Sequence, residues 1–305
     1  MTSQSVTAEA GLGPGASGGQ ASNAPVLDVQ HVSVSYGPYR ALFDVSFAIP
    51  PGGVVALIGS NGAGKSTVAR TITGLVTASE GSVVIGGTDV TRMSAWRIAR
   101  LGVAHVVEGR GIFSSLSVEE NLVLVFRQRA GRQRLSDNLA RAYEEFPILK
   151  GRRKQTAGTL SGGQQRMLSL AKVLVVPPKL LVADELSLGL APVIVDTVYE
   201  GLEAINRSGT AMLVVEQQVD RVLNIASSAL VLDRGRVVYF GSPSGAATTI
   251  DQLISRRERA GARAAALVEQ GVAVPEIVDA VVDDQARDHP PGGTALPGGE
   301  PPSSG

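Results

Sequence analysis

A glycine-rich stretch, GSNGAGKST at residues 59–67, constrains the fold of this chain more than any other feature. It follows the apolar run VVALI (54–58) and opens the helical pattern KSTVARTI. Such a loop between strand and helix predicts a phosphate-binding loop, with glycines around the phosphates, a lysine on the outer phosphates and a serine on Mg²⁺. The alternative is a glycine-rich turn with a purely structural role. If the stretch is a phosphate loop, Ser66 is expected to bind Mg²⁺. Nucleotide contacts are then expected from Gly59, Ser60, Asn61, Gly62, Ala63, Gly64, Lys65, Ser66 and Thr67.

Other short apolar runs have the length of buried strands, and helical patterns separate most of them. This order favours an α/β core with a largely parallel sheet. Near the N-terminus, FDVSFAI (43–49) alternates apolar and polar residues, which predicts a half-buried strand that pairs with VLDVQHVSVSY (26–36) before it. The further buried runs are SVVI (82–85), LLVA (180–183), AMLVV (211–215) and ALVLD (229–233).

Residues from about 92 to 176 are predicted to be mainly helical and to form a subdomain inserted into this core. Ser117 and Glu120 have the spacing of a helix-capping box ahead of an apolar run. Within the insert, 127–154 carries nine Arg and Lys residues, which form either a solvated helix face or a docking face for an acidic partner or lipid headgroups. One helical face before Pro147 is apolar and consists of Leu135, Leu139, Ala142 and Phe146.

Composition excludes several classes of protein. The 305 residues carry 28 basic and 28 acidic side chains, so no overall field attracts nucleic acid, and no nucleic acid partner is expected. The absence of cysteine excludes disulfides and thiolate chemistry. No uncharged apolar run reaches the roughly 18 residues of a membrane span, and the N-terminus has no secretory pattern. We therefore expect a cytosolic chain with at most peripheral membrane contact.

The two ends differ from the middle of the chain. Residues 1–25 and 286–305 are rich in glycine, proline, alanine and serine, which predicts disordered tails. The stretch 251–285 is predicted to form two short helices separated near 271–275. It is either a dimer or regulatory element or a loosely attached tail.

Two further motifs carry charge or free backbone donors. LSGGQQR at 160–166 places two glycines at the start of a helical run, where backbone N–H groups can meet an anion. LLVADE ends a buried strand with Asp184 and Glu185, at the edge of the sheet where ligands of open α/β folds bind. A charge pair at a helix N-terminus is the alternative for this motif alone. Together with Lys65, Asp184 is expected to hold Mg²⁺ and Glu185 to orient and deprotonate an attacking water.

A phosphate loop followed by LSGGQQR and then LLVADE resembles the ATP-binding cassette (ABC) proteins, over about residues 26–250. The resemblance implies a P-loop NTPase fold of the ABC ATPase type, with a mostly parallel sheet, N-terminal antiparallel strands and an inserted helical subdomain. It also implies ATP and Mg²⁺ as cofactors and two ATPase subunits bound head to tail with nucleotides between them. Contacts to the ATP on the other subunit are then assigned to Ser161, Gly162, Gly163 and Gln164.

Three shorter stretches resemble the ATPase subunits of branched-chain amino acid importers, a group also associated with amide and urea uptake. They are SLGLAP (187–192), VEGRGIF (107–113) and VVEQQ (214–218). The resemblance assigns Glu108 to Mg²⁺ and the attacking water, where most cassette ATPases have glutamine. It places Gln217 where most have a switch histidine.

Other positions match or depart from this family. Tyr36 matches the aromatic residue that stacks on adenine, although Tyr39 is close enough to compete, and strand-end packing is the alternative role of Tyr36. Ala191 replaces the usual aspartate after the catalytic glutamate. Leu186 and Val107 stand where the subgroup usually has proline.

The function implied is the ATP-hydrolysing subunit of a membrane importer for branched-chain amino acids or related amino acids and amides. Its partners would be transmembrane permease subunits and an extracellular or periplasmic solute-binding protein, with the ATPase on the cytoplasmic face of the plasma membrane. An exporter subunit is one alternative. A soluble ABC ATPase acting on nucleic acid or ribosomes is another, but the interval from Lys65 to Ser161 has no sustained heptads and the chain has one cassette. A binding module without turnover would not need Glu185.

Overall fold

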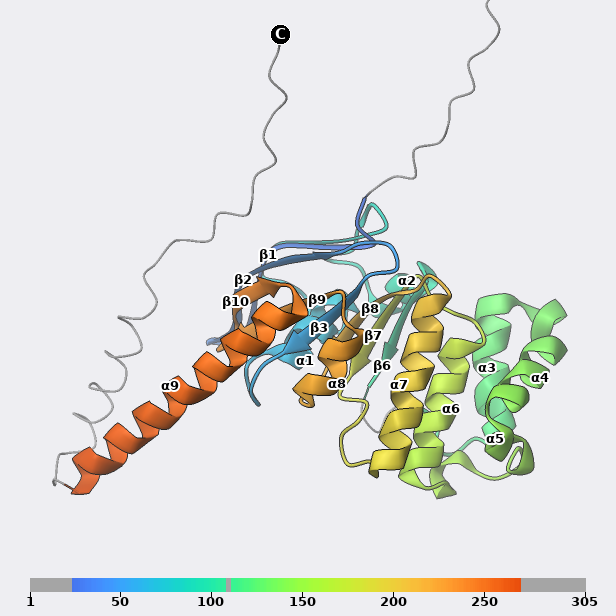
Figure 1. The fold of residues 1–305 in the computed structure, drawn as a ribbon. Helices are drawn as coiled ribbons and strands as arrows, with labels where there is room; N and C mark the ends of the chain where they lie inside the picture. Colours follow the sequence, from blue (N-terminus) through green and yellow to red (C-terminus); the bar gives the residue numbers. More distant parts are fainter. Residues whose placement is uncertain (1–23, 108–110, 270–305) are drawn as a thin grey trace, which may run out of the picture.

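The computed structural model describes residues 24–107 and 111–269. The predicted tails, 1–25 and 286–305, fall almost entirely outside these residues. The described chain contains two sheets (Figure 1). One has six strands in the order β10-β9-β3-β8-β7-β6, and the other has four in the order β2-β1-β4-β5.

The six-stranded sheet forms the centre of the molecule. Five of its strands run parallel, and β10 pairs antiparallel with β9 at one edge. All residues of VVALI in β3 are buried, as expected for a strand covered on both faces. Because the strands are parallel, the chain leaves β3, β7 and β8 at one edge of the sheet. The strands are β3 (Val54–Ile58), β6 (Val103–Val106), β7 (Leu180–Asp184), β8 (Ala211–Val215), β9 (Ser228–Asp233) and β10 (Arg236–Gly241).

The four-stranded sheet is antiparallel, which confirms the prediction for the N-terminal strands. Val29 pairs with Phe47, and Val32 pairs with Val45, so the alternating apolar residues of the two predicted strands share one buried face. The strands are β1 (Leu27–Tyr36), β2 (Tyr39–Ile49), β4 (Glu80–Ile85) and β5 (Thr88–Asp89).

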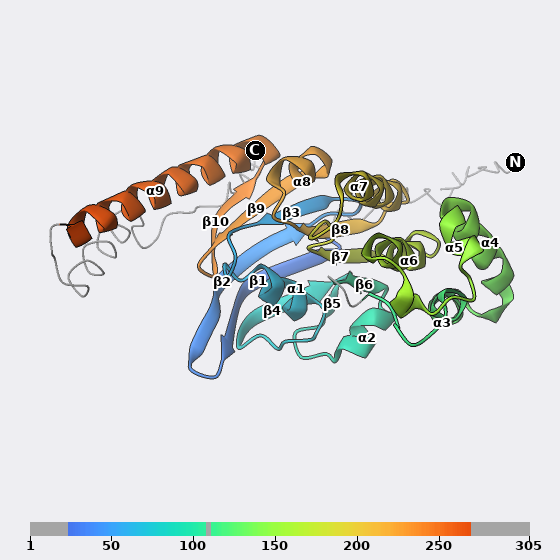
Figure 2. The ribbon, with the colours of Figure 1, turned by 90° about the horizontal axis from the view of Figure 1, so that it is seen from below.

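Helices flank the sheets, and α3 to α5 form a group beyond α6 (Figures 1 and 2). This group lies within the range predicted to be a helical insert. The predicted range, 92–176, also contains β6, which pairs with β7 in the central sheet. Sequence analysis missed this strand because VAHV is short and contains a histidine. The helices are α1 (Lys65–Ile72), α2 (Ala95–Arg100), α3 (Val118–Ala130), α4 (Leu135–Glu145), α5 (Pro147–Gly151), α6 (Gly162–Leu174), α7 (Pro192–Arg207), α8 (Val219–Ile225) and α9 (Pro243–Glu269), with 3₁₀ turns at Arg132–Arg134 and Ala157–Thr159.

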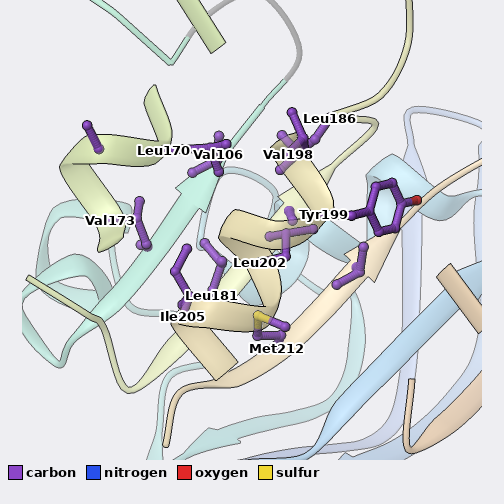
Figure 3. Packing of buried hydrophobic residues seen from close by; sticks show 14 of the residues in the cluster. Val106, Leu170, Val173, Leu181, Leu186, Val198, Tyr199, Leu202, Ile205 and Met212 are labelled. Atoms are coloured by element: carbon purple, nitrogen blue, oxygen red, sulfur yellow. The ribbon is translucent and has the colours of Figure 1, made fainter. Parts of the chain in front are cut away.

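Side chains alternate between the two faces of β3, and each face has its own hydrophobic core. Val55 and Leu57 belong to the core that includes α1 and the four-stranded sheet. Ala56 and Ile58 belong to the core on the opposite face, which includes α6 and α7. Figure 3 shows this second core from close by, with Val106, Leu170, Val173, Leu181, Leu202, Ile205 and Met212 packed together.

Local signals fix the ends of the helices in the insert. The Ser117 hydroxyl accepts the backbone N–H of Glu120 at 3.2 Å, and the Glu120 carboxylate accepts the backbone N–H of Ser117 at 2.7 Å. The predicted capping box at the start of α3 is therefore confirmed. Helix α4 ends at Glu145, ahead of Pro147, as its apolar pattern indicates.

The last described helix, α9, is continuous over 27 residues. Its first turns pack on β9 and β10, where Ala246 is fully buried, and its later turns extend away from the sheets (Figures 1 and 2). The helix therefore crosses the predicted domain boundary at 250, because it begins before that boundary and shares the core. The predicted break near 271–275 lies outside the described residues. Within the described ranges, no helix is both long and apolar enough to span a membrane.

Candidate functional site

The phosphate loop connects the end of β3 to the start of α1. Gly62 and Gly64 have φ angles of 79° and 105°, in the left-handed region that favours glycine. Space is restricted as well. A Cβ atom on Gly64 would lie 2.7 Å from Cδ2 of Leu42, and one on Gly59 would lie 2.3 Å from the carbonyl oxygen of Leu232. The loop keeps its shape only because glycine occupies these positions.

The side chain of Lys65 lies inside the loop and is 4% exposed. Its ammonium group donates to the carbonyl oxygens of Gly59 at 2.8 Å and Ser60 at 3.2 Å. The same Nζ atom lies 3.8 Å from Oε1 of Glu185. A buried cation beside the N-terminus of a helix supplies the charge and the N–H donors that a phosphate group requires.

Ser66 and Asp184 place two oxygen atoms next to each other. The Ser66 hydroxyl, in the first turn of α1, donates to Oδ1 of Asp184, the last residue of β7, at 3.5 Å. Burial raises the pKa of Asp184 and the neighbouring Glu185 carboxylate adds to this shift, whereas Ser66, Arg70 and Lys65 oppose it. A hydroxyl and a carboxylate are ligands that Mg²⁺ takes in nucleotide sites, so this pair fits the predicted metal role.

Glu185 and Gln217 follow neighbouring parallel strands, and their side chains meet. The Gln217 amide donates to Oε1 of Glu185 at 3.0 Å. Glu185 has a φ angle of 50°, which strains a residue other than glycine, and its N–H donates to the carbonyl oxygen of Val215 at 2.9 Å. Gln218 is the N-cap residue of α8. Of the two glutamines, Gln217 is the one whose side chain donates to Glu185.

Sequence analysis missed Glu216, which is buried beside these residues and is 1% exposed. Its carboxylate accepts hydrogen bonds from the backbone N–H of Ser187 at 3.0 Å and from the Ser187 hydroxyl at 2.7 Å. Burial raises the pKa of Glu216, and the hydrogen bonds from Ser187 oppose this shift. A signal was present in the sequence, because an acidic residue directly continues the apolar run of β8.

The signature segment, LSGGQQR at 160–166, begins α6. Ser161 is the N-cap residue: its hydroxyl accepts the N–H of Gln164 at 3.4 Å, and the Gln164 side chain accepts the N–H of Ser161 at 3.2 Å. Ser161 and Gly162 are exposed, and Gly163 is partly covered. Helix α6 belongs to the core that includes Ala56 and Ile58, and α1 belongs to the core on the other face of β3, so the bodies of these two helices cover opposite faces of the central sheet.

Two buried cations of α6 hold Val107 and Gly111, the described residues that precede and follow 108–110. Arg166 donates to the carbonyl oxygen of Val107 at 3.2 Å, and Lys172 donates to that of Gly111. Burial lowers the pKa of Lys172 to about 8. Glu108 itself lies outside the described residues, so its predicted contact with Mg²⁺ stays a prediction.

The predicted adenine contact lies at one end of the four-stranded sheet. Tyr36 ends β1, Tyr39 begins β2, and the two pair across the turn. Their side chains are exposed, Tyr36 by 45% and Tyr39 by 78%. Two of the residues that depart from the family pattern lie in the segment after β7. Ala191 is the N-cap residue of α7, and Leu186 is fully buried in the core that includes α6.

Comparison with known proteins places these features in a family. The sequence profile described as "ABC transporter" matches residues 42–187. The chain is 42% identical over 215 residues to BraG, a high-affinity branched-chain amino acid transport ATP-binding protein of Pseudomonas aeruginosa, covering 70% of this chain and 91% of BraG. It is 32% identical over 218 residues to LivF, a probable branched-chain amino acid transport ATP-binding protein of Archaeoglobus fulgidus, covering 71% and 92%. LptB, the lipopolysaccharide export system ATP-binding protein of Escherichia coli K12, is 29% identical over 220 residues, covering 72% and 91%.

Solved structures agree with the sequence matches. The ADP conformation of an ATP-binding cassette of an ABC transporter aligns with a TM-score of 0.62 at 26% identity, covering 72% of this chain and 91% of that one. A structure of the ATP-binding subunit of an ABC transporter aligns with a TM-score of 0.64 at 25% identity, covering 84% and 99%. The sequence matches and the shared fold show that this chain belongs to the ATP-binding proteins of ABC transporters, a family of ATPases that bind ATP.

Proposed function

We propose that this chain hydrolyses ATP to energise a membrane importer of branched-chain amino acids or related amino acids and amides. The observation that carries the proposal is the meeting of Lys65, Asp184, Glu185 and Gln217 at one edge of the central sheet. These residues come from three separate segments of the chain, each of which follows a parallel strand. The matches to BraG and LivF support the substrate class.

The proposal gives each nucleotide-binding residue a role. Lys65 and the backbone N–H groups of the phosphate loop bind the phosphates and offset their charge. Ser66 and Asp184 hold Mg²⁺, which when bound neutralises charge that develops on the phosphate oxygens. Tyr36 stacks on adenine, and Glu108 contacts Mg²⁺ and the attacking water.

The chemical step falls to Glu185. Its carboxylate accepts a proton from water while the water oxygen attacks the γ-phosphorus, and the bond to the bridging oxygen breaks so that ADP leaves with the electron pair. Gln217 holds Oε1 of Glu185 in place through the 3.0 Å hydrogen bond. Positioning of this kind matters because a base acts only within hydrogen-bond reach of the proton it removes.

We infer that two ATPase subunits bind head to tail. Helices α1 and α6 begin at the phosphate loop and at the signature segment and cover opposite faces of the central sheet, which supports a site that one chain does not close by itself. A second subunit supplies the exposed N-terminus of α6 instead. The hydroxyl of Ser161, the backbone of Gly162 and Gly163 and the side chain of Gln164 then contact the γ-phosphate bound to the other subunit.

Homologous ABC ATPases work with transmembrane permease subunits. We propose that this chain does so at the cytoplasmic face of the plasma membrane, with an extracellular or periplasmic solute-binding protein that acts through the permease. An exporter subunit is the second candidate, because LptB belongs to an export system. The identity to LptB, 29%, is lower than the 42% identity to BraG, which favours import.

Uptake in cells tests the transport function. A strain that lacks this gene is complemented with wild type, Lys65→Ala or the surface variant Glu203→Gln, and uptake of labelled leucine, isoleucine, valine, acetamide and urea is measured. We expect wild type and Glu203→Gln to restore uptake of one of these solutes and Lys65→Ala to restore none. Equal uptake with and without Lys65 would overturn the proposal, and uptake of urea alone would overturn the amino acid assignment.

A further inference from the structure

The proposed mechanism leaves one buried acid without a role. Glu216 lies between Val215, the last residue of β8, and Gln217, and its side chain is 1% exposed. Oε1 accepts the backbone N–H of Ser187 at 3.0 Å, and Oε2 accepts the Ser187 hydroxyl at 2.7 Å. Because Ser187 stands two residues beyond Glu185, one side chain fastens the turn after β7 to the turn after β8.

The backbone at Glu185 depends on such a support. Its φ angle of 50° is unfavourable for a residue with a Cβ atom and persists only where the surroundings hold it. Residues at the end of β8 accept hydrogen bonds from this turn. The N–H of Glu185 donates to the carbonyl oxygen of Val215 at 2.9 Å, and Ser187 donates to Glu216.

We propose that Glu216 is a positioning residue of the ATPase reaction. Through Ser187 it fixes the turn that carries Glu185, and through its own backbone it fixes the adjacent Gln217. The base and the amide that orients it then meet at 3.0 Å. We call Glu216 and Ser187 the Glu216 clamp. The inference rests on the role proposed above for Glu185, and Glu216 acts through its neighbours without touching the substrate.

The groups that face Glu216 come from several elements. Ser187 donates two hydrogen bonds, the backbone N–H of Gln217 donates as well, and Glu185 adds a like charge. Tyr199 of α7 has a buried hydroxyl with no hydrogen-bond partner among the described residues, and the charges of Glu216 and of Arg221 on α8 act on it. Burial raises the pKa of Glu216, which its hydrogen bonds oppose. A proton on the carboxylate removes its charge, so falling pH weakens the Glu216 clamp.

Steady-state ATPase assays of the full chain test the clamp with Glu216→Gln and Ser187→Ala. Glutamine keeps the size of glutamate but has no charge and only one acceptor oxygen, so one of the two hydrogen bonds from Ser187 is lost and the other weakens. We expect kcat to fall about 10- to 100-fold in Glu216→Gln, as for lost hydrogen bonds to a charged group, with KM for ATP changed less than about twofold. The decrease in kcat should be smaller in Ser187→Ala, because the backbone N–H of residue 187 still donates to Glu216. The matched control is Glu203→Gln, an exposed acid on α7, which should have wild-type kcat.

The pH dependence of kcat separates positioning from a loss of fold. The acid limb of the wild type should include a step as pH falls through the raised pKa of Glu216, and Glu216→Gln should lack it and show a less steep limb. The inference would be overturned if Glu216→Gln had the kcat and the acid limb of the wild type. It would also be overturned if Glu216→Gln lost ATP binding while the turnover of bound ATP stayed normal. If Glu216→Gln does not fold, wild-type turnover in Ser187→Ala overturns it.

Glu185→Gln, assayed in parallel, distinguishes this inference from the proposed function. Near-normal turnover in Glu185→Gln overturns the assignment of the base and, with it, the mechanism on which the clamp acts. An inactive Glu185→Gln together with an unaffected Glu216→Gln overturns the Glu216 clamp alone. An inactive Glu185→Gln, a slow Glu216→Gln and an unaffected Glu203→Gln support both.

Discussion

The side-chain amide of Gln217 donates a 3.0 Å hydrogen bond to the carboxylate of Glu185, across 32 positions of sequence. Each residue follows one of two neighbouring parallel strands, so the central sheet itself brings the pair together. A glutamine amide donates and accepts hydrogen bonds but exchanges no proton near neutral pH. Gln217 is therefore suited to orient Glu185, whereas a histidine in its place could also carry a proton.

Substitution of Gln217 tests this role. We expect Gln217→Ala to lower ATP turnover while ATP affinity stays nearly unchanged, because the amide contacts the base and the variant keeps Lys65 and the phosphate loop. Gln217→His should keep much of the activity, since imidazole also donates. Only the histidine variant should gain a step in its rate–pH profile near the unperturbed imidazole pKa of about 6.5. The control is Gln218→Ala. If hydrolysis is lost in Gln218→Ala while turnover is normal in Gln217→Ala, Gln218 and not Gln217 orients the base.

Motifs with fixed local spacing were readable from the sequence. The phosphate loop requires glycine at φ angles of 79° and 105°, and Lys65 must follow within the same turn, so a few adjacent residues determine the structure. The acidic pair Asp184 and Glu185 and the capping box of Ser117 were readable for the same reason. Each is local, and each ends or begins a periodic element.

Features that depend on distant residues were not readable. Glu216 is a member of the site only because Ser187, 29 positions away in sequence, donates to it. Strand β6 is held by its register with β7, in which His105 pairs with Val182, and not by an apolar pattern of its own. Arg166 and Lys172 are buried against carbonyl oxygens of a segment some 60 positions earlier, and no local pattern of α6 indicates these contacts.

Replacement of Glu185 tests the base. Glu185→Gln keeps size and hydrogen bonding but cannot accept the proton, so we expect ATP to bind while hydrolysis falls by about 10²–10⁴-fold, as for lost general-base catalysis. A dimer closed around ATP should then persist. Size-exclusion chromatography with Mg-ATP should show a dimer for Glu185→Gln that the wild type shows only transiently. Near-normal turnover would contradict this and direct attention to Glu108.

Mixing two inactive variants tests the composite site. Lys65→Ala removes the phosphate contact of one subunit, and Ser161→Arg blocks the signature segment of the other. In the proposed head-to-tail dimer the two motifs of a chain serve different sites, so a mixed dimer has one site with both defects and one intact site. We expect the mixture to recover part of the ATPase activity that neither variant has alone. No recovery at any mixing ratio would count against the composite site.

The stability of the fold should depend on the protonation of His105. Its Nδ1 lies 3.3 Å from the Thr73 hydroxyl, and its Nε2 is buried with no hydrogen-bond partner in the described part of the chain. Burial together with the charge of Arg70 lowers the pKa of His105 from 6.5 to about 4. The unfolded chain takes up a proton below pH 6.5 and the folded chain does not, so the free energy of unfolding should fall between pH 6.5 and about 4, by an amount on the order of 1–3 kcal/mol. Urea unfolding of wild type, His105→Asn and the exposed control His31→Asn measures this. The stability of the wild type relative to His105→Asn should decline over that interval, and a difference independent of pH would show that His105 is not held neutral.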